Sequence, residues 1–257
     1  QMIKVWEAID GAEPTSFADS HATLSPQEKE SKAVFPHPNE PAMEACQYRL
    51  DNLAKPIHSL GYLERIAVQI AGITGRACPS LDLTAALLVL TKENGLSADL
   101  EKILSAMTAD AHIPVHILSL SANVNTSDEA RKAAHNLACT YPLLILGTAG
   151  ADDEAIAGAI TGAAEAGSLI LPGDAQTDRI ARNCTGANTA LLPYILHVIP
   201  DMLTADAELP AGTAGILGME IVRAALHVVN DMKTFTEADV AVAIDGAGAG
   251  RQVRERA

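Results

Sequence analysis

The sequence predicts an α/β fold, a Rossmann-like parallel sheet flanked by helices, with a small helical subdomain built from the N- and C-terminal segments. Three observations support this. The chain has 257 residues, 48% of them hydrophobic and only 19% charged, so it can bury a sizeable core. Short apolar runs alternate with helix-length segments through its middle, as in parallel sheets with right-handed crossovers. Helical periodicity dominates both ends.

The N-terminal segment predicts an irregular arm followed by two helices. Residues 1–41 are polar and punctuated by five prolines, which is typical of a segment ordered only by a partner surface. A helix fits 42–54 and ends before Pro56. Ser59 is expected to cap a second helix over 60–74, which stops at Gly75.

The middle of the chain predicts the α/β domain, residues 77–215. The expected strands are 83–91, 114–120, 141–147 and 168–171. The expected helices between them are 96–110, 127–139 and 152–166.

The C-terminal segment is ambiguous after Asn188 until a long amphipathic helix over 216–232. Thr234 or Thr236 is then expected to cap a short last helix. Residues 42–76 and 216–245 together predict the small helical subdomain, and the glycine-rich residues 246–257 a flexible tail.

Composition excludes several classes of function. Acidic residues outnumber basic ones by 32 to 18, which argues against nucleic-acid binding. Apolar runs are too short to cross a bilayer, and no secretory signal is visible. The four cysteines form no CxxC pair, and Pro114 separates His112 from His116, so no metal site is expected. The sequence thus predicts a cytoplasmic protein without membrane contact.

Three motifs carry a family resemblance. Residues 49–64, RLDNLAKPIHSLGYLE, resemble RLDxLxKPxGSLGxLE, the opening motif of the nicotinate-nucleotide:dimethylbenzimidazole phosphoribosyltransferases. Residues 156–164 are similar to that family's LAGAxLGAA helix. Residues 223–240 are similar to its RAAxxxLNEMATFxEAGV segment. The motifs occur in the family's order and span residues 46–240.

The resemblance implies a fold and an activity. Members of this family have a Rossmann-like domain and a small helical domain that reaches the active site of the other subunit in a dimer. They move phosphoribose from nicotinate mononucleotide to the base that becomes the lower ligand of cobamides. A glutamate acts as general base, and neither metal nor cofactor is required.

The chain departs from the family where the chemistry takes place. The glutamate position is Ala211, within the sequence PAGTAG, and a methyl group cannot accept a proton. No catalytic residue is therefore expected. Asn125 and Thr126 keep part of a GIGNTT phosphate and ribose loop without its glycines. With Gly212 and Thr213 they form a vestigial binding loop.

These departures resemble the shorter, degenerate subunit of the two-subunit phenol and p-cresol phosphoribosyltransferases. The resemblance implies a heterodimer in which a larger catalytic homologue binds nicotinate mononucleotide and a phenol or benzimidazole acceptor. Lys55, Ser59 and His58 are the candidates for contacts to substrate in trans. Their structural alternatives are a pairing of Lys55 with Asp51, a cap made by Ser59 and a plain surface position for His58.

Two further hypotheses remain open. The chain is a self-sufficient homodimeric transferase if another acid, such as Glu208, has become the general base. It is a non-enzymatic module if it only binds a mononucleotide or a small aromatic molecule. The sequence does not identify the acceptor.

Overall fold

The computed structural model describes residues 38–92, 95–109, 111–121, 125–198 and 211–240. Its sheet has four strands in the order β2-β1-β3-β4, and all three pairings are parallel. The strands are β1 (Ala85–Lys92), β2 (Val115–Leu120), β3 (Leu143–Ala149) and β4 (Leu169–Pro172). The first seven residues of β1 are all buried, because β1 is a central strand covered on both faces. The predicted α/β class is confirmed.

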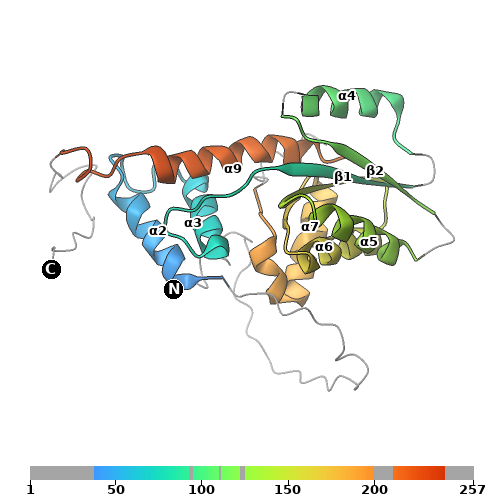
Figure 1. Ribbon diagram of the computed structural model, residues 1–257, viewed down its shortest axis with the longest axis horizontal. Coiled ribbons are helices and arrows are strands. Elements are labelled where there is room, and N and C mark those ends of the chain that lie inside the picture. Colours follow the sequence, from blue (N-terminus) through green and yellow to red (C-terminus); the bar gives the residue numbers. More distant parts are fainter. Residues whose placement is uncertain (1–37, 93–94, 110, 122–124, 199–210, 241–257) are drawn as a thin grey trace, which may run out of the picture.

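Helices cover both faces of the sheet (Figure 1). Alternation along β1 sends Leu88 and Leu90 into a core with the helices on one face, and Leu87 and Val89 into the core on the other. The first group comprises α5 (Thr126–Ala138), α6 (Asp153–Glu165) and α7 (Ala175–Ala187). The second comprises α4 (Ala98–Ala109) and α9 (Thr213–Asp231). The predicted elements between residues 83 and 171 are present, each shifted by no more than two residues at either end.

The long helix α9 joins the sheet to the N-terminal helices α2 (Glu40–Asn52) and α3 (Tyr62–Thr74). Its first turn packs on the sheet, and its last turn lies beside α2 (Figure 1). Arg49 of α2 donates to the carbonyl oxygens of Val229 and Met232 at 2.8 and 3.2 Å. These bonds satisfy acceptors at the C-terminal end of α9, which have no partner within the helix.

Several sequence predictions need correction. The first helix begins at Glu40, inside the predicted arm, with Asn39 as its N-cap. Ser59 does not cap α3, because the helix begins at Tyr62 with Gly61 at the N-cap. The last short helix is wrong, since 235–239 form turns. α7, which the sequence analysis does not predict, begins with a capping box between Asp174 and Thr177.

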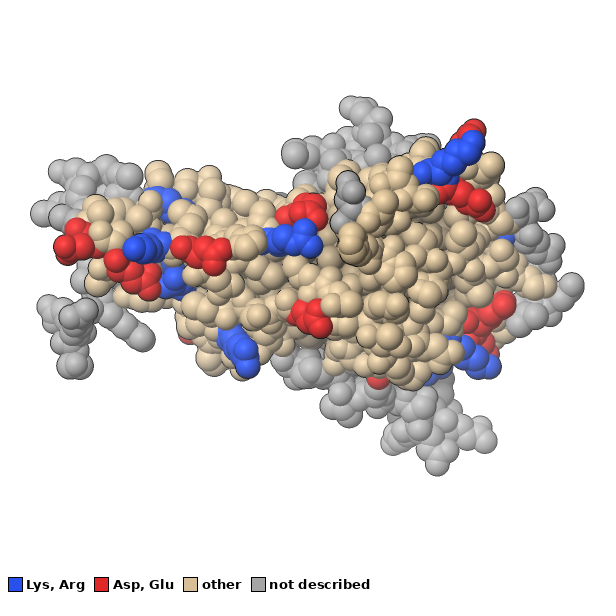
Figure 2. Space-filling view, turned by 45° about the horizontal axis from the view of Figure 1, so that its top comes forward, with Lys and Arg blue, Asp and Glu red and all other residues tan. Residues whose placement is uncertain are grey.

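The rest of the N-terminal arm, residues 1–37, and the predicted tail over 246–257 lie outside the described residues. None of the helices in the described ranges combines the length and apolar character needed to cross a membrane. Basic and acidic side chains are interspersed on the face shown in Figure 2. The cytoplasmic location stays a prediction.

A buried polar network ties the segment after the 3-10 helix η2 (Thr189–Tyr194) to α7 and α3. His197, 2% exposed, lies with its Nδ1 3.1 Å from Oδ1 of Asp178. Arg182 donates to Oδ2 of Asp178 at 2.8 Å. Burial opposes the charge of Asp178, but the bonds from His197 and Arg182 outweigh it and hold the pKa of this carboxyl below its ordinary value. The ionised carboxylate therefore stabilises the fold.

Replacing Asp178 by Asn is expected to lower the free energy of unfolding at pH 7 by roughly 2 kcal/mol, because charge-assisted bonds to His197 and Arg182 are lost. The native pKa is depressed, so this stabilisation is present above the unfolded value and is lost as the pH falls through the native value. Urea titrations of both proteins from pH 7 to pH 3 should show the difference shrinking with acid. A constant difference would contradict the role of the charge.

Candidate functional site

The topology directs attention to one edge of the sheet. In open parallel sheets, ligands bind beyond the carboxyl ends of the strands, where the strand order reverses. Here the order reverses between β1 and β3. A single antiparallel bridge between Thr91 and Gly150 joins the ends of these two strands. Backbone of residues 91 and 150 thus lies where a ligand-binding crevice is expected.

Ala211, which occupies the expected glutamate position, lies directly before α9. It is fully buried and has φ +52°, and Gly212 follows with φ +92° as the N-cap of α9. Thr213, in the first turn, is 1% exposed. Gly212, as the N-cap, offers no side chain to this helix start. These three residues are packed inside the protein rather than presented to solvent.

Glycines allow the start of α9 to touch the ends of the central strands. A methyl group on Gly147 of β3 would lie 2.4 Å from the backbone nitrogen of Gly212. One on Gly173, which follows β4, would lie 2.5 Å from Cα of Gly212. Such distances leave no room even for one carbon atom. The backbone of α9 therefore fills the space in which a phosphate would meet the helix N-terminus.

Backbone N–H groups at the end of β3 and in the loop to α6 are also hydrogen-bonded within the protein. The Thr148 N–H donates to Oδ2 of Asp174 at 2.7 Å, and the Ala151 N–H donates to the Thr148 hydroxyl at 3.1 Å. Burial raises the pKa of Asp174, while bonds from Thr177 and Thr148 oppose that rise. A protein carboxyl group thus takes the place that an anion would need.

Asn125 and Thr126 start α5 at the same edge. The side chain of Asn125 accepts the Asp128 N–H at 3.4 Å and donates to Oδ2 of Asp128 at 3.1 Å. Thr126 donates to the carboxylate of Asp152, the N-cap of α6, at 3.2 Å. Both predicted loop residues are thus engaged in helix starts that carry carboxylates, which repel a phosphate. Asn123 and Val124 lie outside the described residues.

Lys55, His58 and Ser59 lie together in the turn between α2 and α3. The Lys55 ammonium donates to Oε1 of Glu64 at 2.9 Å, with the two side chains 6% and 3% exposed. The same oxygen accepts the Leu60 N–H at 3.1 Å. His58 and Ser59 are exposed. The buried Glu64 carboxylate thus stabilises the turn through these two bonds, while His58 and Ser59 face solvent.

The backbone explains one departure from the first motif. His58 has φ +57°, a left-handed conformation that glycine adopts without strain. The resembling family has glycine at this position. His58 keeps the glycine-type backbone and adds an exposed imidazole ring.

Two groups of predicted site residues, the turn after α2 and the start of α9, lie far apart. Ala211, Gly212 and Thr213 lie at the start of α9, and Ala54, beside Lys55, donates its N–H to the Lys233 carbonyl just past the helix end. A helix of 19 residues is about 28 Å long, so the groups lie near its opposite ends (Figure 1). One copy of the chain does not bring them together.

Two acids at the site edges have only weak signals in the sequence. Glu64 belongs to the first motif, and its place at the start of a helix, nine residues after Lys55, is typical of a capping acid. Asp174 follows a strand and precedes Thr177 by three residues, which is a capping-box spacing. Glu208, the alternative general base, lies outside the described residues.

Comparison with known proteins supports the first motif most directly. A family model described as phosphoribosyltransferase matches residues 35–112. The nicotinate-nucleotide–dimethylbenzimidazole phosphoribosyltransferase of Halalkalibacterium halodurans is 40% identical over 58 residues, which are 23% of this chain and 16% of that protein. The enzyme of the same name from Ruminiclostridium cellulolyticum is 43% identical over 58 residues, again 23% and 16%. The resemblance to these dimethylbenzimidazole phosphoribosyltransferases is confirmed, whereas the likeness to a degenerate subunit stays a prediction.

Solved structures extend the likeness of the fold. The nicotinate-nucleotide-dimethylbenzimidazole phosphoribosyltransferase of Thermus thermophilus aligns with a TM-score of 0.61 at 17% identity, over 79% of this chain and 99% of that one. A second Thermus thermophilus structure, named CobT, gives 0.61 at 16% identity, over 78% and 99%. At this identity the likeness concerns the fold. The family model ends before Asn125 and before the start of α9.

Proposed function

We propose that this chain is the non-catalytic partner in a heterodimeric phosphoribosyltransferase that makes the lower-ligand nucleotide of cobamides. A larger homologous subunit supplies the active site. The complex moves phosphoribose from nicotinate mononucleotide to a phenol or benzimidazole acceptor. The partner's glutamate accepts the acceptor's proton, the acceptor bonds to C1′ of the ribose, and the bond from C1′ to the nicotinate nitrogen breaks.

The main support for this proposal is the close packing of Ala211 and the start of α9 against the strand ends. A methyl side chain stands at the general-base position, and Gly147 and Gly173 bring the backbone of α9 into contact with the strand ends. A methyl side chain accepts no proton, and the backbone contacts among the described residues leave no space for a phosphate between Gly212 and the strand ends. The chain keeps the fold and the first motif, which the comparisons match best.

The turn between α2 and α3 is the part of this chain proposed to reach the partner's substrate. Ser59 and His58 are exposed there, whereas Lys55 is held by Glu64. We therefore assign Lys55 a positioning role, and Ser59 and His58 the direct contacts. The distance of about 28 Å along α9 between this turn and Ala211 favours a contribution in trans.

The test is an assay of the chain alone, of the larger homologue alone, and of the co-purified pair. Nicotinate mononucleotide is the donor, and phenol and dimethylbenzimidazole are offered separately as acceptors. We expect product from the pair and none from this chain alone. Release of nicotinate and formation of the riboside phosphate are both followed by liquid chromatography. Product from the purified chain alone would remove the proposal.

Two glutamine variants locate the general base within the pair. Replacing the partner's motif glutamate by glutamine is expected to abolish turnover. Replacing Glu208 of this chain by glutamine should leave turnover unchanged. Glu220, exposed and paired with Arg223, is the matched control for an acid near the same motif. Loss of turnover in Glu208→Gln alone would favour the self-sufficient enzyme instead.

A further inference from the structure

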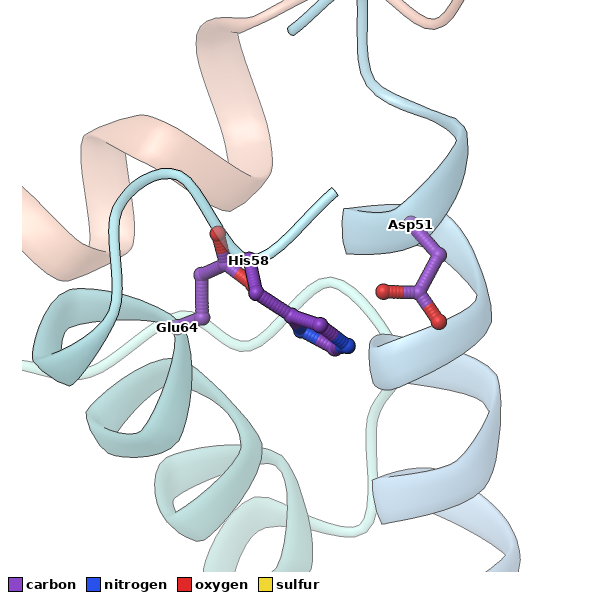
Figure 3. A group of neighbouring side chains, drawn as sticks. All are labelled: Asp51, His58 and Glu64. Atoms are coloured by element: carbon purple, nitrogen blue, oxygen red, sulfur yellow. The ribbon is translucent and has the colours of Figure 1, made fainter. Parts of the chain in front are cut away.

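Three possible metal-ligating side chains meet between α2 and α3. Asp51 comes from the last turn of α2, His58 from the connecting turn and Glu64 from the first turn of α3 (Figure 3). One ligand atom from each lies within 4.8 Å of the other two. Nδ1 of His58 is 3.6 Å from Oε2 of Glu64, a separation suited to two ligands of one ion. The cluster combines two carboxylates with one imidazole.

The buried oxygen of Glu64 is the independent indication of a ligand. Glu64 is 3% exposed, and its Oε2 has no hydrogen-bond partner among the described residues. Its other oxygen already accepts from Lys55 and the Leu60 N–H. A buried carboxylate oxygen without a donor is destabilising, because it has lost its hydration and no hydrogen bond replaces it. A cation beside His58 would satisfy it.

We propose that Asp51, His58 and Glu64 bind a divalent first-row transition ion, with Zn²⁺ as the probe. Imidazole and carboxylate are both good Zn²⁺ ligands, and three protein ligands leave a fourth position for water. Tetrahedral ligands with bonds near 2 Å lie about 3.3 Å apart, so atoms that are within 4.8 Å of one another must approach by up to about 1.5 Å. The side chain of His58 is 72% exposed, so its ring is free to make this movement. The proposal departs from the expectation of no metal site that the sequence gives.

Charge around the cluster is compatible with such an ion. Asp51 and Glu64 contribute two negative charges, and Lys55 balances one of them through Oε1 of Glu64. Gln47 donates to Oδ1 of Asp51 at 2.8 Å and so orients that carboxylate, as outer partners do in metal sites. The proposal does not depend on the proposed transferase function, since it uses only residues of this chain.

The experiment is a Zn²⁺ titration of the full chain by calorimetry, compared with His58→Gly and His227→Ala. Glycine suits the left-handed φ of position 58, so this variant removes the imidazole while preserving the turn. His227, exposed and near Asp231, is a matched surface histidine. Cys78 and Cys139, both exposed, contribute equally to all three proteins. We expect His58→Gly to weaken the tightest site at least tenfold and His227→Ala to leave it unchanged.

A second variant, Asp51→Asn, is expected to weaken the same site while circular dichroism stays unchanged. The heat of metal binding reports the site directly, without any assay of turnover. Equal Zn²⁺ binding by wild type and His58→Gly would overturn the proposal. So would absence of binding to the wild type, in which case His58 makes only an ion pair with Glu64.

Discussion

Replacing Lys55 by Met is expected to lower the free energy of unfolding by about 3–5 kcal/mol, one of the two largest effects predicted for this chain. Methionine keeps most of the apolar stem but removes the ammonium that lies 2.9 Å from Oε1 of Glu64. The carboxylate of Glu64 then stays buried with the Leu60 N–H as its remaining close donor among those described above. An uncompensated buried charge is among the most destabilising single changes.

The measurement is urea unfolding followed by circular dichroism, with two comparison variants. Lys102→Met removes an ammonium from a highly exposed pair with Asp99, and no measurable change is expected. Adding Glu64→Leu to Lys55→Met removes both charges and should recover much of the lost stability. A Lys55→Met protein as stable as Lys102→Met would show that the pair does not hold the turn.

The same variant bears on the proposed complex. If Lys55 positions Ser59 and His58, Lys55→Met should weaken assembly with the larger homologue or raise the KM of the complex for nicotinate mononucleotide. Ser59→Ala should affect the KM without a comparable loss of stability, because Ser59 is exposed and makes no helix cap. The two variants together distinguish a positioning residue from a contact residue.

The α/β class followed from the sequence because its signals are local and strong. A central parallel strand such as Ala85–Lys92 must be apolar on both faces, so it appears as a continuous run. α7 has no such signal, because its residues are polar on average and its sequence, AQTDRIARNCTGA, carries Asn, Thr and Gly inside a helix. Only the capping box at its start indicated it.

The site was harder to predict, because it depends on contacts between segments distant in the chain. The motif alone assigns Ala211 to the glutamate position, but the burial of Ala211 against Gly147 arises from packing between residues 64 positions apart. Helical spacing predicts a pairing of Lys55 with Asp51, whereas the turn brings Lys55 to Glu64. A left-handed residue such as His58 makes that turn, and a sequence pattern does not report its φ.

Replacing Gly147 by Ala is the second change with a large expected effect. Gly147 lies within β3 and is not among the glycines of positive φ, so alanine fits the backbone conformation and the test is purely steric. The added carbon would lie 2.4 Å from the nitrogen of Gly212 and 2.5 Å from the carbonyl carbon of Ala211. Both are backbone atoms that cannot rotate away, so α9 must shift. We expect a loss of about 3 kcal/mol in the free energy of unfolding.

Gly186→Ala is the matched control, because beyond the nearby backbone of α7 itself no described heavy atom lies within 4 Å of a carbon added at that position. It should raise stability by about 0.5–1 kcal/mol, since alanine is the better helix former. If Gly147→Ala were instead as harmless as Gly186→Ala, α9 would stand further from the strand ends than the contacts require. Space for a phosphate would then exist beside Ala211, and the proposed absence of a substrate site in this subunit would lose its physical basis.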